Sequence, residues 1–83
     1  MAAKKKPPRV TKLRDLKKIL RRYGIQYGPG GRHMRFQDDT GKKYPLPFTD
    51  GNDDVERDYV AGIRRKFGLT EEDGVSNEEF YKK

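Results

Sequence analysis

The chain contains no cysteine, no tryptophan and only one histidine among its 83 residues. Without cysteine it can form neither a disulfide nor a thiolate metal site, and it has no cysteine nucleophile, so its fold must depend on packing alone. This composition suits the cytoplasm, where we expect the protein to act. Because apolar residues never form a long run, we expect neither a membrane span nor export through a signal peptide.

Apolar residues are also scarce, at 31% of the chain against 40% charged residues. These values approach the composition of disordered proteins. The nine aromatic residues nevertheless occur at spaced, periodic positions, so we expect a thin but real core. A chain of this length allows one small domain with one simple site and excludes a multidomain enzyme.

The net charge of +7 is unevenly distributed along the chain. Residues 1–36 hold twelve Lys or Arg and one acidic residue, whereas residues 37–83 hold eight Lys or Arg and twelve acidic residues. A basic half is typical of a surface that binds polyanions, because each cation that neutralises a phosphate releases a condensed counterion. The alternative is that the positive charge serves only solubility.

The pattern of residues divides the chain into two parts. Residues 1–9, MAAKKKPPR, lack apolar periodicity and are predicted to be a disordered basic arm, followed by one domain over residues 10–83. Apolar residues at helical spacing predict one helix over 11–23, capped by Thr11, and a second over 55–67, capped by Asp53 or Asp54. A short C-terminal helical turn is expected to start at Ser76.

Three short strands are predicted between the two helices, over 25–28, 32–37 and 43–48. The glycine-rich stretch 28–31 is interpreted as the hairpin loop between the first two. Strict alternation in the second strand places Met34 and Phe36 on one side and His33 and Arg35 on the other. The sequence therefore predicts an α+β fold: a two-layer sandwich of order α-β-β-β-α, whose three-stranded antiparallel sheet carries both helices on one face.

His33 is the candidate catalytic residue, because histidine is the side chain best suited to moving protons at neutral pH. Its neighbours Arg32 and Arg35 suit phosphodiester chemistry, since a guanidinium can hold the phosphate while the imidazole moves the proton. An inert strand histidine is the alternative. The acidic loop 50–54 begins like a calcium-binding loop but lacks the required glycine and final glutamate, so no metal and no cofactor are expected.

Several short motifs, in this order, resemble the HicA toxins of bacterial HicAB toxin–antitoxin systems. They are Leu13-x-x-Leu16-x-x-x-Leu20, Tyr23-Gly24-Ile25, Gly31-Arg32-His33-Met34-Arg35-Phe36, Tyr44-Pro45-Leu46-Pro47 and Val60-x-x-Ile63-Arg64-Arg65-x-Phe67-Gly68-Leu69. The resemblance implies a fold like the double-stranded-RNA-binding domain and messenger RNA cleavage through one histidine. His33 matches that histidine and Gly31 matches the family's glycine. A HicB-like antitoxin is the implied protein partner.

Our hypothesis is an RNA-binding domain that cleaves messenger RNA on its exposed sheet face, with His33 as general acid or base. The predicted RNA-binding residues are Gly31, Arg32, Arg35, Lys42, Lys43, Lys17 and Lys18. If the 2′-hydroxyl of RNA is the nucleophile, the reaction needs no metal. Two alternatives remain open: a noncatalytic nucleic-acid-binding module in which His33 is an ordinary strand residue, and an adaptor that binds an acidic protein.

Overall fold

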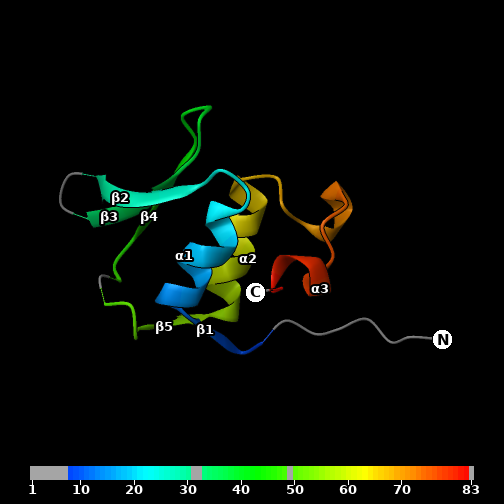
Figure 1. The fold of residues 1–83 in the computed structure, drawn as a ribbon, viewed down its shortest axis with the longest axis horizontal. Coiled ribbons are helices and arrows are strands. Elements are labelled where there is room, and N and C mark those ends of the chain that lie inside the picture. The colour runs from blue at the N-terminus through cyan, green and yellow to red at the C-terminus, as the bar shows by residue number, and fades with distance from the viewer. Residues whose placement is uncertain (1–7, 31–32, 49, 83) are drawn as a thin grey trace.

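The computed structural model describes residues 8–30, 33–48 and 50–82, and Figure 1 shows their arrangement. The elements in chain order are β1 Val10–Lys12, α1 Leu13–Arg21, β2 Gln26–Gly30, β3 His33–Gln37, β4 Lys43–Leu46, β5 Asp54–Glu56, α2 Arg57–Lys66, the 3-10 turn η1 Glu71–Asp73 and α3 Asn77–Phe80. The predicted basic arm falls largely on residues 1–7, which lie outside the described residues.

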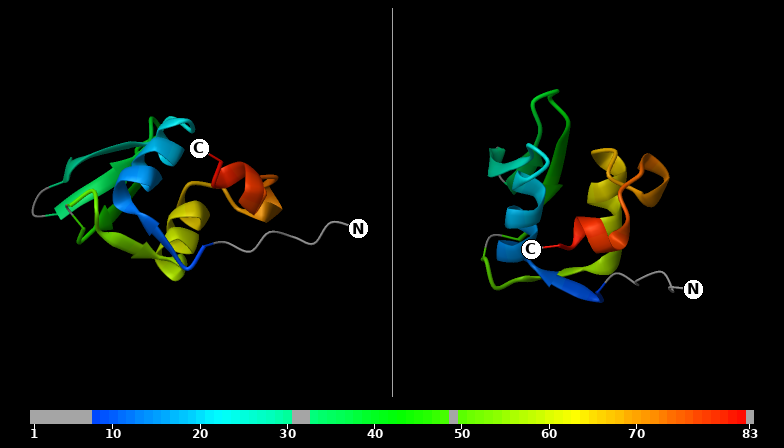
Figure 2. Two further views of the ribbon diagram at one scale, coloured as in Figure 1. Left: turned by 60° about the horizontal axis from the view of Figure 1, so that its bottom comes forward. Right: turned by 45° about the vertical axis from the view of Figure 1, so that its right-hand side comes forward.

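Helices α1 and α2 lie side by side against one face of the three-stranded sheet, which has the order β2-β3-β4 with antiparallel neighbours (Figures 1 and 2). The core fills the space between helices and sheet. Leu16 and Leu20 of α1, Ile63 of α2 and Phe36 and Leu46 of the sheet are all at most 1% exposed. The predicted α+β class and the antiparallel sheet are therefore confirmed.

The predicted order α-β-β-β-α is wrong in one respect, because two further strands form a second sheet. β1 pairs with β5 antiparallel, with Thr11 opposite Val55 and Lys12 opposite Asp54. Lys12 and Asp54 also form an ion pair, with 2.6 Å between Nζ and Oδ1. The observed order is β-α-β-β-β-β-α, and the short second sheet ties the starts of both helices together.

The predicted helix caps are also wrong, because β1 and β5 come directly before α1 and α2. Thr11 lies buried in β1, and neither helix has a side-chain cap at its first turn. Instead, backbone carbonyls accept the first free N–H groups: Leu13 N donates to Asp53 O at 2.9 Å, and Arg57 N donates to Arg9 O at 2.8 Å. Backbone pairing therefore satisfies groups that a capping side chain would otherwise satisfy.

The C-terminal segment folds back onto α2 around a buried arginine. Arg64 is 7% exposed and donates hydrogen bonds to the carbonyls of Leu69 and Val75 and to the side chain of Asn77. Its guanidinium lies 4.6 Å from the centroid of the Phe80 ring. Because Phe80 is fully buried, this arrangement completes the core with residues from the end of the chain.

Candidate nucleic-acid interface

The face of the three-stranded sheet that points away from the helices carries the candidate site. Strand register arranges its outward-facing residues in three rows across the sheet: Gly30 and His33; Gly28, Arg35 and Pro45; Gln26, Gln37 and Lys43. The predicted alternation in β3 is supported, since Phe36 is buried in the core and His33 is exposed. His33 and Arg35 therefore point to the same open face.

The glycine-rich stretch is a strand at this site and not the loop that was predicted. Gly28, Pro29 and Gly30 all belong to β2 and pair with Arg35, Met34 and His33 of β3. Glycine and proline are depleted in strands, so local propensity favours a loop here. In the folded domain β2 is an edge strand, where proline is tolerated and glycine lets another group approach the backbone closely.

Arg35 uses the space that Gly30 leaves. A Cβ atom built on Gly30 would lie 2.8 Å from Nε of Arg35 and even closer to its Cδ, so the arginine side chain lies directly against the Gly30 backbone. A Cβ on Gly28 would meet nothing within 4 Å. The side chain of Arg35 thus lies over Gly30, the residue that pairs with His33, while the surface over Gly28 stays open.

His33 lies at the start of β3, exposed, opposite Gly30. Its imidazole makes no hydrogen bond within the part of the chain that the structure describes. Two of the predicted binding residues next to it, Gly31 and Arg32, lie outside the described residues. Of the predicted site, the structure therefore brings together His33 and Arg35.

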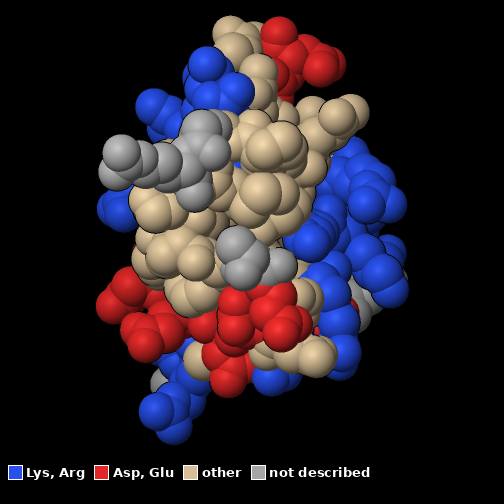
Figure 3. Space-filling model, turned by 90° about the vertical axis from the view of Figure 1, so that its left-hand side faces the viewer, with Lys and Arg blue, Asp and Glu red and all other residues tan. Residues whose placement is uncertain are grey.

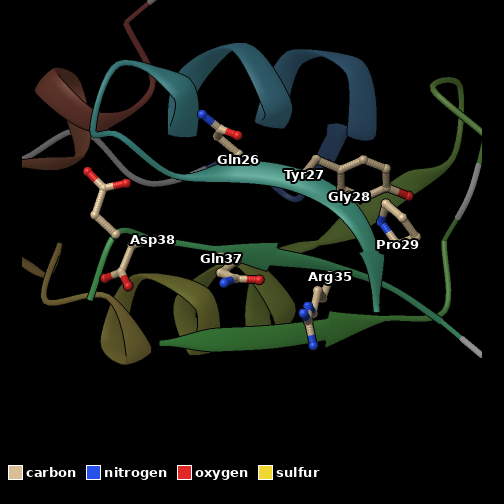
Figure 4. A pocket seen from close by; sticks show the side chains of 8 residues that line it. Gln26, Tyr27, Gly28, Pro29, Arg35, Gln37 and Asp38 are labelled. Atoms are coloured by element: carbon tan, nitrogen blue, oxygen red, sulfur yellow. The ribbon is translucent and has the colours of Figure 1, made fainter. Parts of the chain in front are cut away.

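A hollow of about 290 Å³ adjoins Arg35 on the open face (Figure 4). It is lined by Gln26, Tyr27, Gly28, Pro29, Arg35, Gln37, Asp38 and Asp39. Gln26 and Gln37 occupy paired positions of β2 and β3, but Figure 4 shows their amides turned away from each other. Neither side chain makes a hydrogen bond to any described residue. Sequence reasoning missed both. Alternation from His33 through Arg35 could have placed Gln37 on this face, whereas the position of Gln26 depends on a register that no local pattern reveals.

Asp38 closes one end of the hollow and shapes the turn after β3. Its carboxylate accepts hydrogen bonds from the backbone N–H of Thr40 and Lys42 and from the Thr40 hydroxyl. Desolvation raises the pKa of Asp38, but these hydrogen bonds outweigh it, and the net pKa lies below its usual value. The interpretation of Asp38 as a turn residue is thus supported.

The predicted lysines fall into two groups. Lys43 lies on the open face beside Gln37, and Lys42 is exposed in the adjoining turn. Lys17 and Lys18 are on α1. Lys17 lies at the β2 edge, with its Nζ 4.2 Å from the centroid of the Tyr27 ring, and Lys18 is exposed. Figure 3 shows how Lys and Arg side chains gather along one side of this end of the molecule, with Asp and Glu below.

A second hollow lies between α1 and β2 and links these groups. It is lined by Lys17, Arg21, Ile25, Gln26 and Tyr27, so it shares Gln26 and Tyr27 with the first hollow. Desolvation, followed by the charge of Asp53, raises the pKa of Tyr27, whose hydroxyl donates to Phe48 O at 2.7 Å. The cations of α1 and the open face are therefore parts of one surface that continues around the β2 edge.

Among residues 8–30, 33–48 and 50–82, no group of three or more His, Asp or Glu side chains could hold a metal ion. None of the helices in those ranges is long and apolar enough to cross a membrane. No protein-family model, curated protein or solved structure matches the chain. The resemblance to HicA toxins therefore rests on the sequence motifs alone.

Proposed function

We propose that this protein is an RNA-binding ribonuclease of the HicA type, with a two-layer arrangement like that of the double-stranded-RNA-binding domain. The observation that carries the proposal is the placement of His33 and Arg35 side by side on the uncovered sheet face, over the side-chain-free backbone of Gly28 and Gly30. A ribose-phosphate unit can approach the backbone of Gly28 closely, because no side chain stands there, whereas the side chain of Arg35 covers Gly30.

In the proposed reaction, the 2′-hydroxyl oxygen attacks the adjacent phosphorus and the bond from phosphorus to the 5′-oxygen breaks. His33 accepts the proton of the 2′-hydroxyl as general base or donates a proton to the leaving 5′-oxygen as general acid. Arg35 binds the phosphate and stabilises the charge that develops on its oxygens. The products are a 2′,3′-cyclic phosphate and a free 5′-hydroxyl, so the substrate must be RNA.

RNA binding away from the reacting phosphate involves Lys43 and Lys42 on the open face and Lys17 and Lys18 on α1. The net charge of +7 and the continuous surface around the β2 edge support this assignment. Such contacts bind phosphates without reading sequence and weaken with salt. Gly31, which matches the family's glycine, and Arg32, the arginine that precedes His33 in the sequence, belong to the same proposal.

The proposal also includes a HicB-like protein partner, since an exposed ribonuclease site must be covered when the host's own messages are to survive. An acidic partner complements the positive charge of the chain. Co-purification from the native host followed by mass spectrometry should recover a stoichiometric small protein. Recovery of RNA alone would contradict this part of the proposal.

The experiment is cleavage of an end-labelled RNA by the purified protein in the presence of EDTA, with DNA of the same sequence as control. We expect cleavage of RNA only and products ending in 2′,3′-cyclic phosphate. Binding of RNA without cleavage would contradict the ribonuclease and favour the noncatalytic module. An absence of binding to either polymer would favour the protein adaptor.

A further inference from the structure

We propose that the end of the sheet where β2 ends and β3 begins is a docking surface for a protein segment that combines apolar side chains with carboxylates. This surface, the end patch, consists of Tyr27, Pro29, Met34 and Phe48. The bound segment is expected to compete with RNA, and that expectation alone rests on the proposed function.

The end patch continues the core side of the sheet beyond the part that the helices bury. Tyr27 pairs with Phe36 and Pro29 pairs with Met34, so all four residues lie on the face that carries the helices. Phe36 is fully buried, whereas Tyr27 and Met34 are half-buried and Pro29 is exposed. Met34 does not pack against the buried core cluster of the described residues. The sheet therefore presents apolar surface that the domain itself leaves uncovered.

Phe48 is held in the end patch by two contacts. The Tyr27 hydroxyl donates to its backbone O at 2.7 Å, and its ring packs edge-on against Tyr59, with 5.2 Å between the centroids. Phe48 is nevertheless only half-buried. Because these contacts already fix its position, binding of a partner requires little ordering of the patch.

Charges of opposite sign border the end patch. Figure 3 looks onto this end of the molecule, with Lys and Arg along one side and Asp and Glu below. Lys17 Nζ lies 4.2 Å from the Tyr27 ring centroid, and Arg21 lines the same hollow as Lys17. The pKa of Tyr27 is raised by desolvation and then by the charge of Asp53. A segment whose carboxylates face α1 complements this arrangement.

The acidic border favours a protein segment over RNA at the end patch. The loop 50–54 carries three Asp residues, which repel the phosphates of a strand that crosses the patch. Bases bind single-stranded sites by stacking on aromatic rings, but Lys17 already lies over the Tyr27 ring. Pro29 and Met34 instead offer aliphatic and thioether surface, which suits the apolar side chains of a protein.

A segment bound at the end patch would lie next to the proposed catalytic residue. The pair Gly30 and His33 directly adjoins the pair Pro29 and Met34 in the ladder of β2 and β3. The segment would also cover Lys17, one of the predicted RNA contacts. Binding at the end patch should therefore lower the affinity for RNA.

The test selects peptides from a random library displayed on phage against the purified protein, and measures the best peptide by fluorescence anisotropy. Enriched peptides should combine Asp or Glu with Leu, Met or Phe. Met34→Gln, which keeps the length of the side chain, should raise the Kd at least about fivefold, and Lys17→Gln about threefold. Val10→Ser is the matched control, because Val10 is 45% exposed but lies in β1, and it should change the Kd less than about twofold.

Methyl NMR locates the bound peptide, since the sequence has only two methionines, Met1 and Met34. The Met34 methyl signal should shift on addition of the peptide, and RNA should displace the peptide. No enriched peptide, or an equal Kd in wild type and Met34→Gln, overturns the docking surface. A Met34 shift caused by RNA alone, or by raising the protein concentration alone, overturns it in favour of RNA or of a second copy.

The proposed function is decided by separate measurements. Peptide binding that RNA does not displace overturns the competition with RNA. Loss of RNA cleavage or of RNA binding in the wild-type protein contradicts the ribonuclease, whereas the dependence of peptide binding on Met34 stands or falls by itself.

Discussion

The side chain of Arg35 lies directly against the backbone of Gly30, in space that any other residue at position 30 would fill. A Cβ on Gly30 would approach Nε of Arg35 to 2.8 Å and its Cδ more closely. Gly30 also pairs with His33 across the strands. One glycine thus sets where the guanidinium lies relative to the imidazole, which links the sequence of β2 to the chemistry proposed for β3.

Gly30→Ala should therefore displace Arg35 and reduce RNA cleavage at least about tenfold, because misplacement of a phosphate-binding group weakens transition-state stabilisation. The fold should survive, since only a flexible side chain has to move. Gly28→Ala is the comparison, because its new methyl group meets nothing within 4 Å. Single-turnover cleavage and thermal melting of both variants check this. An equal loss of cleavage in the two variants would contradict the role assigned to Gly30.

The same two glycines show where prediction from the sequence failed. The periodic residues of α1, α2 and β3 predicted the helices and the exposed side of His33, because amphipathic patterns report burial directly. Glycine and proline at residues 28–30 predicted a loop. In the structure Gly30 makes room for Arg35 of the neighbouring strand, and a local sequence pattern cannot reveal such a contact. β1 and β5 have three residues each, too few for an alternation to be visible, and they exist only through mutual pairing.

The candidate site was predicted in part. His33 and Arg35 were assigned to one face, and the structure places them there together with Lys43. The hollow with Gln26 and Gln37 was missed, because polar uncharged residues give no signal until the strand register is known. Lys17 and Lys18 were predicted from charge alone, and their position relative to His33 depends on how α1 packs on the sheet.

Removal of residues 1–7 should weaken RNA binding and its dependence on salt while leaving the domain folded. Those residues include Lys4, Lys5 and Lys6, whereas Arg9 must stay because its carbonyl accepts from Arg57 N. Each lost phosphate contact lowers the slope of log K against log salt by about 0.7 for a single strand, so the slope should fall by about 2. Fluorescence anisotropy titrations at salt concentrations between about 50 and 200 mM measure this slope. An unchanged slope would show that the arm contacts no phosphate.

Arg64→Ala should lower the free energy of unfolding by about 2–3 kcal/mol, because three buried or half-buried acceptors on the C-terminal segment lose their charged donor. The neighbouring Arg65 is exposed, so Arg65→Ala should change stability by less than about 0.5 kcal/mol. Urea denaturation followed by circular dichroism compares the two. Similar midpoints for both variants would contradict the structural role of Arg64.

The turn after β3 should loosen in acid. The pKa of Asp38 is lower in the folded protein than its ordinary value, so its contribution to the turn is complete above about pH 4 and is lost as the pH falls through the folded pKa. Amide NMR signals of Thr40 and Lys42 should shift together in that acidic range. In Asp38→Asn this titration should disappear, and its persistence would assign it to another group.

The most direct test of the account compares rate and affinity in the same preparation of His33→Ala. Cleavage of a labelled RNA gives the rate, and anisotropy on the uncleavable 2′-deoxy version gives the affinity. We expect the rate to fall by about 10² to 10⁴ while affinity stays within a few fold, because a positioned acid or base acts alone whereas binding is shared among many cations. Arg35→Ala should lower both quantities. If His33→Ala cleaves RNA as fast as the wild type, His33 is not the catalytic residue and the central claim is wrong.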